Sequence, residues 1–237
     1  KAYLISLSIV NKINNRALDY IKFIVEKQID KLGMHKSYNL LEHSKFINNL
    51  NEIKNILLFF KLEGSGVFDK IILKMTSILN EYFHYDGTLP LFNGTNNIYT
   101  KSIYGSINKE NYLKKREFSN INNGIAFYSD KYKKIFFDVV QPTSDMISSN
   151  LSAGTLSIEI SGFNEKIITN CGYGVNISNK ARLFSRFTSS QSTLCINDTS
   201  IVSFEKSNVM NKAYGFLTKK DFKILNLEDK NDTSETQ

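Results

Sequence analysis

The sequence predicts an α+β protein in which helices come first and an antiparallel β-sheet follows. Two observations predict this fold class. Before about residue 90, apolar residues recur at the spacing of a helix. After YDGTLPLFNGTNN, residues 85–97, apolar and polar residues alternate with the period of a strand. We therefore expect two domains, a helical one over residues 1–90 and a β domain, truncated, over residues 91–237.

The helical part is predicted to hold three or four helices joined by short polar turns. Three apolar stripes define them. The stripes are Leu18, Ile21, Ile24, Val25 and Ile29, then Ile53, Ile56, Leu57 and Phe60, then Ile71, Ile72, Met75, Ile78 and Leu79. The polar segment EGSGVFDK, residues 63–70, separates the last two stripes. The opening segment AYLISLSIV is apolar but short, and it fits a helix better than a membrane anchor.

The β part is predicted to form an antiparallel sandwich of short strands. The expected strands are GIAFYSD, KKIFFDVV, GTLSIEISG, EKIITNCG, QSTLCIND and TSIVSFEKS, all between residues 124 and 207. They are rich in Ile, Val, Phe and Thr and are bounded by Asn, Asp, Gly or Ser, as strands usually are. The segment SGFNEK, residues 161–166, reads as the turn of a hairpin.

The composition favours an acidic partner. The net charge is +7 and the sequence pI is about 9.2, which suits an acidic polysaccharide, a nucleic acid or an anionic membrane. A Lys-, Asn- and Ile-rich composition accounts for the charge equally well. The lysines form no stripe with interleaved aromatics, which argues against a nucleic-acid binder. No apolar run reaches the ~18 residues of a membrane span. Lys1 and the polar end at residues 226–237 indicate a fragment of a longer protein.

Histidine chemistry is restricted to the helical part, because the three histidines are His35, His43 and His84. His84 lies in EYFHYDG, between Tyr82 and Tyr85, and Tyr with His can move a proton beside a neutralised carboxylate. An ordinary packing or surface role stays open for each histidine. The glycine turns lack the spacing of a phosphate-binding loop, and no GxSxG or HExxH motif occurs.

Four segments occur in an order that resembles the bacterial heparinase II/III-like family. They are EKQIDKLGMHKS, YFHYDGTLPLFNG, SAGTLSIEISGFNEKIITNCG and RLFSRFTSSQSTLCINDTS. The resemblance implies polysaccharide lyases of the bacterial cell envelope or periplasm. It also implies the last helices of an incomplete α/α toroid, followed by an antiparallel β-sandwich. Members cleave acidic, uronate-containing glycans, such as glycosaminoglycans, by β-elimination in a cleft between the domains.

The resemblance, with the chemistry of the side chains, implies a set of site residues. His35 is expected to neutralise or orient the substrate carboxylate, while Tyr82 and His84 transfer protons. Tyr85 is the alternative to Tyr82. The remaining expected substrate-binding residues are Asn150, Ser152, Arg182, Arg186 and Gln191, with Tyr85. The two arginines suit a uronate carboxylate, and the alternative is that they only line a strand edge.

The resemblance also points to a metal site that this sequence has altered. Relatives carry His at the position of Ser152, Asp or Asn at the position of Asn170, and His at the position of Gln191. Neutral hydroxyl and amide groups are poor zinc ligands, so we predict no metal and no other cofactor. Two explanations remain. Asn150 and these three residues form a polar cluster in a working lyase, or the protein is a non-catalytic envelope relative that binds acidic glycans.

Overall fold

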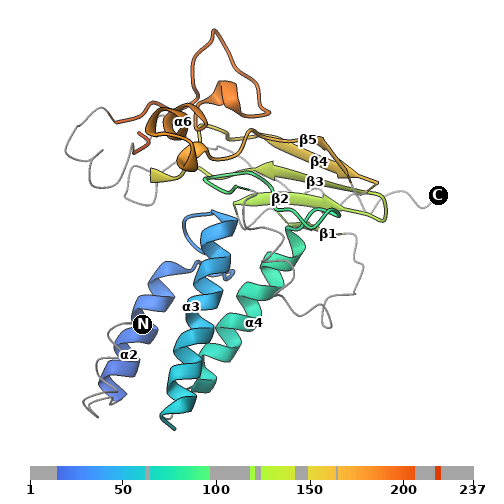
Figure 1. Cartoon of the computed structure of the whole chain (residues 1–237). Coiled ribbons are helices and arrows are strands. Elements are labelled where there is room, and N and C mark those ends of the chain that lie inside the picture. The colour runs from blue at the N-terminus through green and yellow to red at the C-terminus, as the bar shows by residue number, and fades with distance from the viewer. Residues whose placement is uncertain are drawn as a thin grey trace.

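The computed structural model describes residues 15–61, 65–96, 118–120, 124–141, 149–163, 165–205 and 217–219. Three long helices come first: α2 (Asn15–Gln28), α3 (Leu40–Phe59) and α4 (Ser65–Glu81). They lie side by side, and a sheet lies across one end of them (Figure 1). The predicted order of helices followed by sheet is therefore confirmed.

The helices form where the apolar stripes predict them, and each buries its stripe. Val25 of α2, Leu57 of α3 and Met75 of α4 are all buried. The stripe edges, Ile24 and Phe60, stay partly exposed. One core cluster runs from these helices to Phe127 and Phe136 of the sheet and so crosses the predicted boundary at residue 90. The division into two domains stays a prediction.

The start of α3 is fixed by a side chain that also holds the helix–sheet junction. Asn39 is the N-cap, and its Oδ1 accepts hydrogen bonds from the N–H groups of Leu41 (2.9 Å) and Glu42 (3.1 Å). The same oxygen accepts from Thr95 Oγ1 (3.3 Å), and Thr95 Oγ1 accepts from Leu40 N (3.2 Å). The cap therefore joins α3 to the buried segment that follows α4.

Replacing Asn39 with Ala should destabilise the chain by about 1–2 kcal/mol, because two helix N–H groups and the Thr95 hydroxyl lose their acceptor. Asn39→Ser, which keeps a capping oxygen, should lose less than Asn39→Ala. Urea unfolding followed by circular dichroism measures both changes. Equal losses in the two variants would show that capping is not the source of the effect.

The strands form one five-stranded antiparallel sheet in the order β1-β2-β3-β4-β5. They are β1 (Phe118–Asn120), β2 (Ile125–Ser129), β3 (Lys133–Asp138), β4 (Ile158–Gly162) and β5 (Glu165–Ile168). Each strand pairs with its neighbours in the sequence, so the sheet is a meander. The hairpin predicted at SGFNEK is confirmed as the β4–β5 connection.

Two predicted strands are wrong in the described part of the chain. QSTLCIND and TSIVSFEKS form only isolated bridges, between Ile196 and Thr199 and between Phe204 and Thr218. The physical reason is that the first segment bonds to β4 and to the residues just before it through scattered groups rather than through a ladder. Ile158 N donates to Ser192 O (3.1 Å), while Thr193 Oγ1 donates to Thr155 O (3.1 Å).

The face of the sheet turned away from the helices is apolar. Cross-strand pairing puts Ile135, Ile160 and Ile168 in one row and Phe137 beside Ile158. Such neighbours project from the same face of a sheet. Phe137 and Ile168 each remain 37% exposed, so this face keeps apolar surface in contact with solvent.

Candidate functional site

The inner face of β4 is polar, which inverts the usual pattern of a half-buried strand. Ser157, just before β4, and Glu159 and Ser161 within it are fully buried, whereas Ile158 and Ile160 are only half-buried. Alternation along the strand puts the three polar side chains on the face toward the helices. There they meet the junction segment, which we define as residues 82–96, between α4 and the sheet.

Glu159 is the centre of a buried hydrogen-bond network. Its Oε2 is 3.1 Å from His84 Nε2 and 3.0 Å from Lys166 Nζ. Its Oε1 accepts from the backbone N–H groups of Leu91 and Asn170, both at 3.0 Å. Burial would raise the pKa of this carboxyl, but the hydrogen bond from His84 and the charge of Lys166 outweigh it and hold the pKa at about 2.

His84 is a neutral structural bridge in this network. Burial lowers its pKa, against the opposing hydrogen bond to Glu159. Glu159 can only accept when ionised, so we assign the ring proton to Nε2. His84 Nδ1 then accepts from Ser161 Oγ at 2.7 Å. A Ser–His–Glu order of bonds resembles a hydrolase triad, but these side chains are at most 2% exposed and no substrate can reach Ser161.

The two tyrosines beside His84 are bound to backbone carbonyls. Tyr82 is fully buried, its hydroxyl donates to Ile125 O (3.1 Å), and its ring packs edge-on against Phe127. Tyr85 donates to Asp130 O, and the Lys134 ammonium lies 5.1 Å from the centre of its ring. Both tyrosines therefore join the junction segment to the sheet.

His35 lies at the turn between α2 and α3. Its Nδ1 is 2.8 Å from Ser37 Oγ, and its ring packs against Phe46. Its backbone N–H donates to Nδ1 of His43 (3.1 Å), a buried histidine whose pKa burial lowers to about 4. His35 contacts helical residues, whereas His84 contacts β4, so the structure does not join these two candidates in one site.

Three polar side chains meet at the opposite end of the sheet from the β4–β5 turn. Tyr173 lies just before a 3₁₀ turn, η3 (Gly174–Asn176), and Arg182 lies on the short helix α6 (Asn179–Phe184). Arg182 Nε donates to the Tyr173 oxygen at 2.6 Å, and the Tyr173 hydroxyl donates to Asn150 Oδ1 at 3.1 Å. We call this chain of half-buried groups the Asn150–Tyr173–Arg182 cluster.

The cluster depends on a close approach of two backbones at Gly174. A Cβ built there would lie 2.6 Å from the carbonyl oxygen of Ala181, so only glycine fits. Ser178 caps α6 through Ala181 N (3.0 Å), and Ser185 Oγ accepts from Gly174 N (3.0 Å). Sequence reasoning named Asn150 and Arg182 but missed Tyr173, whose only local signal is its place beside this glycine.

The other predicted site residues form hydrogen bonds that join separate loops. Ser152 N donates to Asn93 Oδ1 (3.3 Å), and Gln191 Nε2 donates to Ser185 O (2.7 Å). Asn170 Oδ1 accepts from Ser192 N (2.8 Å). Arg186 is fully buried, its Nε donates to Leu151 O (2.7 Å), and its cation lies over the Phe204 ring. These groups hold the loops around β4 in place.

The positions where the resemblance implies a metal site do not fit a zinc ion. Ser152, Asn170 and Gln191 offer neutral oxygens and amides, and the Asn170 oxygen already accepts from the backbone. In the described ranges no group of three His, Cys, Asp or Glu side chains is placed to hold a metal. No chemical step is therefore assigned to a metal at these positions.

A second buried carboxyl lies where β3 ends. Asp138 Oδ1 accepts from Val140 N (3.0 Å), and both of its oxygens are 3.2 Å from Asn93 Nδ2. Burial raises the pKa of Asp138 to about 7, against the opposing hydrogen bonds from Val140 and Asn93. Sequence reasoning missed this residue, because it reads as the polar end of an ordinary strand.

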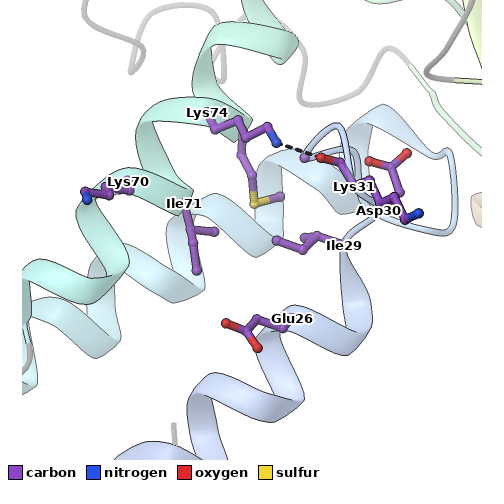
Figure 2. A pocket seen from close by; sticks show the side chains of 9 residues that line it. Glu26, Ile29, Asp30, Lys31, Lys70, Ile71 and Lys74 are labelled. Atoms are coloured by element: carbon purple, nitrogen blue, oxygen red, sulfur yellow. Dashed lines mark hydrogen bonds between the residues drawn. The ribbon is translucent and has the colours of Figure 1, made fainter.

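A pocket of about 410 Å³ lies between the end of α2 and α4 (Figure 2). Its lining mixes acidic Glu26 and Asp30 with Lys31, Lys70 and Lys74. Lys74 Nζ donates to Lys31 O (2.7 Å) and so closes one side of it. None of the predicted site residues lines this pocket, and its mixed charges favour no single class of ligand.

Within the described helices, none is long and apolar enough to cross a membrane.

Comparisons with solved structures show the fold. The chain matches the heparan sulfate lyase HepC of Pedobacter heparinus with 15% identity and a TM-score of 0.58, over 79% of this chain and 34% of that one. It matches the heparinase III BT4657 gene product with 13% identity and a TM-score of 0.62, over 79% and 34% of the two chains. It matches a further heparinase III with 14% identity and a TM-score of 0.58, over 78% of this chain and 36% of that one. The chain thus spans about a third of these proteins.

A family model supplies the remaining comparison. The model described as "Heparinase II/III-like, C-terminal" matches residues 117–235, which is 119 of the 237 residues. No curated protein matches the chain. The match covers half of the sequence and includes β1 to β5, Glu159 and the Asn150–Tyr173–Arg182 cluster. On this match, the chain belongs to the heparinase II/III-like family.

Proposed function

We propose that the chain is part of a polysaccharide lyase that cleaves uronate-containing glycans by β-elimination. The observation that carries the proposal is the Asn150–Tyr173–Arg182 cluster, in which a phenol lies between a cation and an amide. Family membership supports the reaction class. Heparan sulfate lyase and heparinase III, which share the fold, support an acidic glycan as the substrate class.

The cluster contains the groups that β-elimination needs. The Arg182 guanidinium suits a bidentate contact with the uronate carboxylate, which lowers the cost of removing the proton at C5. The Tyr173 oxygen takes the proton from C5 while its own hydroxyl proton passes to the leaving oxygen, so the C4–O4 bond breaks, the C4=C5 double bond forms and the phenol is regenerated. Before the reaction, Asn150 Oδ1 accepts from this hydroxyl and Arg182 Nε donates to its oxygen, which orients the phenol.

Tyr82, His84 and His35 remain candidates named from the sequence, but their contacts favour a structural role. The Tyr82 hydroxyl and both ring nitrogens of His84 are bonded inside the protein. A proton-transfer group needs access to the substrate, which burial denies to both. We therefore assign the proton transfer to Tyr173 and the holding of the junction segment to Tyr82 and His84.

Tyr173→Phe should lower the rate of glycan cleavage by about 10²–10⁴-fold, because it removes the proton-transfer group and leaves the ring in place. The readout is the absorbance at ~232 nm of the unsaturated uronate, on incubation with heparan sulfate and other acidic polysaccharides. The matched controls are Tyr20→Phe on the exposed face of α2 and Tyr82→Phe in the core. A Tyr82→Phe variant that folds but loses all activity would return the role to Tyr82.

The second candidate is a non-catalytic envelope protein that binds acidic glycans. It is favoured by Ser152, Asn170 and Gln191, which are engaged in loop contacts where relatives are expected to carry metal ligands. Binding of heparan sulfate without any rise in absorbance, in a protein carrying all its domains, would support this candidate. An Arg182→Ala variant should weaken binding under either function.

The proposed architecture is an α/α toroid whose last helices are α2 to α4, followed by a β-sandwich. The apolar outer face of the sheet supports a second layer, since Phe137 and Ile168 remain partly exposed there. We also propose a location in the cell envelope or periplasm, on family grounds. Protease protection in intact cells, lost when the outer membrane is opened, tests the location.

A further inference from the structure

An exposed aromatic pair lies at the turns of two neighbouring hairpins. Tyr132, in the β2–β3 turn, is 58% exposed, and Phe163, in the β4–β5 turn, is 84% exposed. Their ring centres are 6.4 Å apart. Lys131 Nζ lies 5.2 Å from the centre of the Tyr132 ring, and Lys133, at the start of β3, keeps half of its side chain exposed. We call these four residues the hairpin patch.

The two turns that carry the hairpin patch are held by hydrogen bonds of their backbone. Asp130 Oδ1 accepts from the N–H groups of Tyr132 (2.7 Å) and Lys133 (2.9 Å), which fixes the first turn. Phe163 N donates to Tyr132 O (3.3 Å) and so joins the second turn to the first. The backbone that carries the two rings therefore needs little ordering on contact with a ligand, and preorganised groups bind with a smaller entropic cost.

Phe163 occupies a backbone conformation that a bulky residue seldom adopts. Its φ is +52°, in the left-handed region that suits glycine or asparagine in hairpin turns. Glycine or asparagine at this position would make the turn more stable, and burial of the exposed Phe163 ring does not offset the strain. Non-glycine residues held in this backbone region cluster at ligand-binding and other functional sites.

Lys131 is the cation of the hairpin patch that favours an anionic ligand. Its Nζ lies beside the Tyr132 ring, whereas Lys133 Nζ lies 5.6 Å from the centre of the Tyr128 ring, and the nearby acids are Asp130 and Glu165. Asp130 is engaged within its turn and lies 3.8 Å from Lys133. Flat ring faces beside an ammonium group suit a chain of sugar rings that carries carboxylates or sulfates, because sugars stack on aromatic faces while the lysine meets their anionic groups.

We infer that the hairpin patch is a second binding site for acidic polysaccharide, separate from the Asn150–Tyr173–Arg182 cluster. The choice of a uronate glycan rests on the proposed function. The two sites lie at opposite ends of the sheet (Figure 1), and β3, which runs between those ends, is ~17 Å long. A long glycan chain can occupy both sites, and the patch then holds the polymer near the cluster.

Phe163→Asn tests the inference without endangering the fold, because asparagine suits the left-handed turn position better than phenylalanine. Binding of fluorescent heparan sulfate chains to the 237-residue protein is measured by anisotropy, with dextran as the uncharged comparison. We expect Phe163→Asn and Tyr132→Ala each to weaken binding at least about 5-fold, with thermal stability unchanged or raised in Phe163→Asn. Lys131→Gln should reduce the salt dependence of binding.

The matched control is Phe59→Ala, which removes a ring that is 80% exposed at the end of α3. It should leave binding unchanged. Unaltered affinity in both patch variants would overturn the inference, and so would a loss of self-association in place of a loss of glycan binding. The readout does not require turnover, so failure to form unsaturated product contradicts the proposed lyase while leaving this result intact.

Discussion

Glu159→Ala is expected to destabilise the chain by about 3–5 kcal/mol, which is the typical cost of removing one partner of a buried ion pair. Lys166 would keep a largely buried ammonium without its carboxylate, and the N–H groups of Leu91 and Asn170 would lose their acceptor. Equilibrium unfolding in urea measures the loss. A change below about 1 kcal/mol would contradict the central position that we give to Glu159.

Glu165→Ala is the matched control, because Glu165 lies at the exposed start of β5 in the same hairpin. Its removal should change the free energy of unfolding by no more than about 0.5 kcal/mol. Glu159→Gln adds a second comparison. It keeps one acceptor oxygen but loses the charge, so it should fall between the wild type and Glu159→Ala.

The second large effect is a pH dependence that Asp138 imposes on stability. The folded chain holds a proton on Asp138 up to about pH 7, whereas the ordinary value of this carboxyl is 3.8. Between those values the folded state binds more protons than the unfolded state, so the free energy of unfolding falls as pH rises. The full effect corresponds to about 4 kcal/mol.

Asp138→Asn isolates this effect, because the histidines titrate alike in both proteins. Burial lowers the pKa values of His43 and His84, and both therefore add stability as pH rises through the weakly acid range. We expect the difference in unfolding free energy, variant minus wild type, to increase from about pH 5 to about pH 8. A difference that stays constant with pH would show that Asp138 is ionised throughout.

The elements that the sequence predicted are those that depend on local periodicity. The stripes of α2 to α4 and the alternation in β2 to β5 each need only neighbouring residues to be recognised. QSTLCIND has the same alternation, but Ser192 and Thr193 bond to Ile158 and Thr155 one group at a time. Whether a strand-like segment pairs depends on a free edge beside it, which local pattern does not encode.

The candidate site was less predictable because its key groups are fixed by distant partners. In SIEIS, alternation suggests isoleucine inward and Glu159 outward, yet the reverse holds. The junction segment offers His84 and the Leu91 N–H to the inner face, and these need an acceptor there. Tyr173 contacts Arg182 because η3 and α6 approach each other at Gly174, and the spacing of residues in the sequence does not predict this contact.

The meander of the sheet and the position of Glu159 together imply an order of folding events. The β1–β2, β2–β3 and β4–β5 pairs close short loops, and we expect such contacts to form early. The bond between Glu159 and Leu91 joins residues 68 positions apart, so we expect it to form later. Interactions absent from the transition state mainly slow unfolding. We therefore expect Glu159 to slow the unfolding of the native state without increasing the rate of folding.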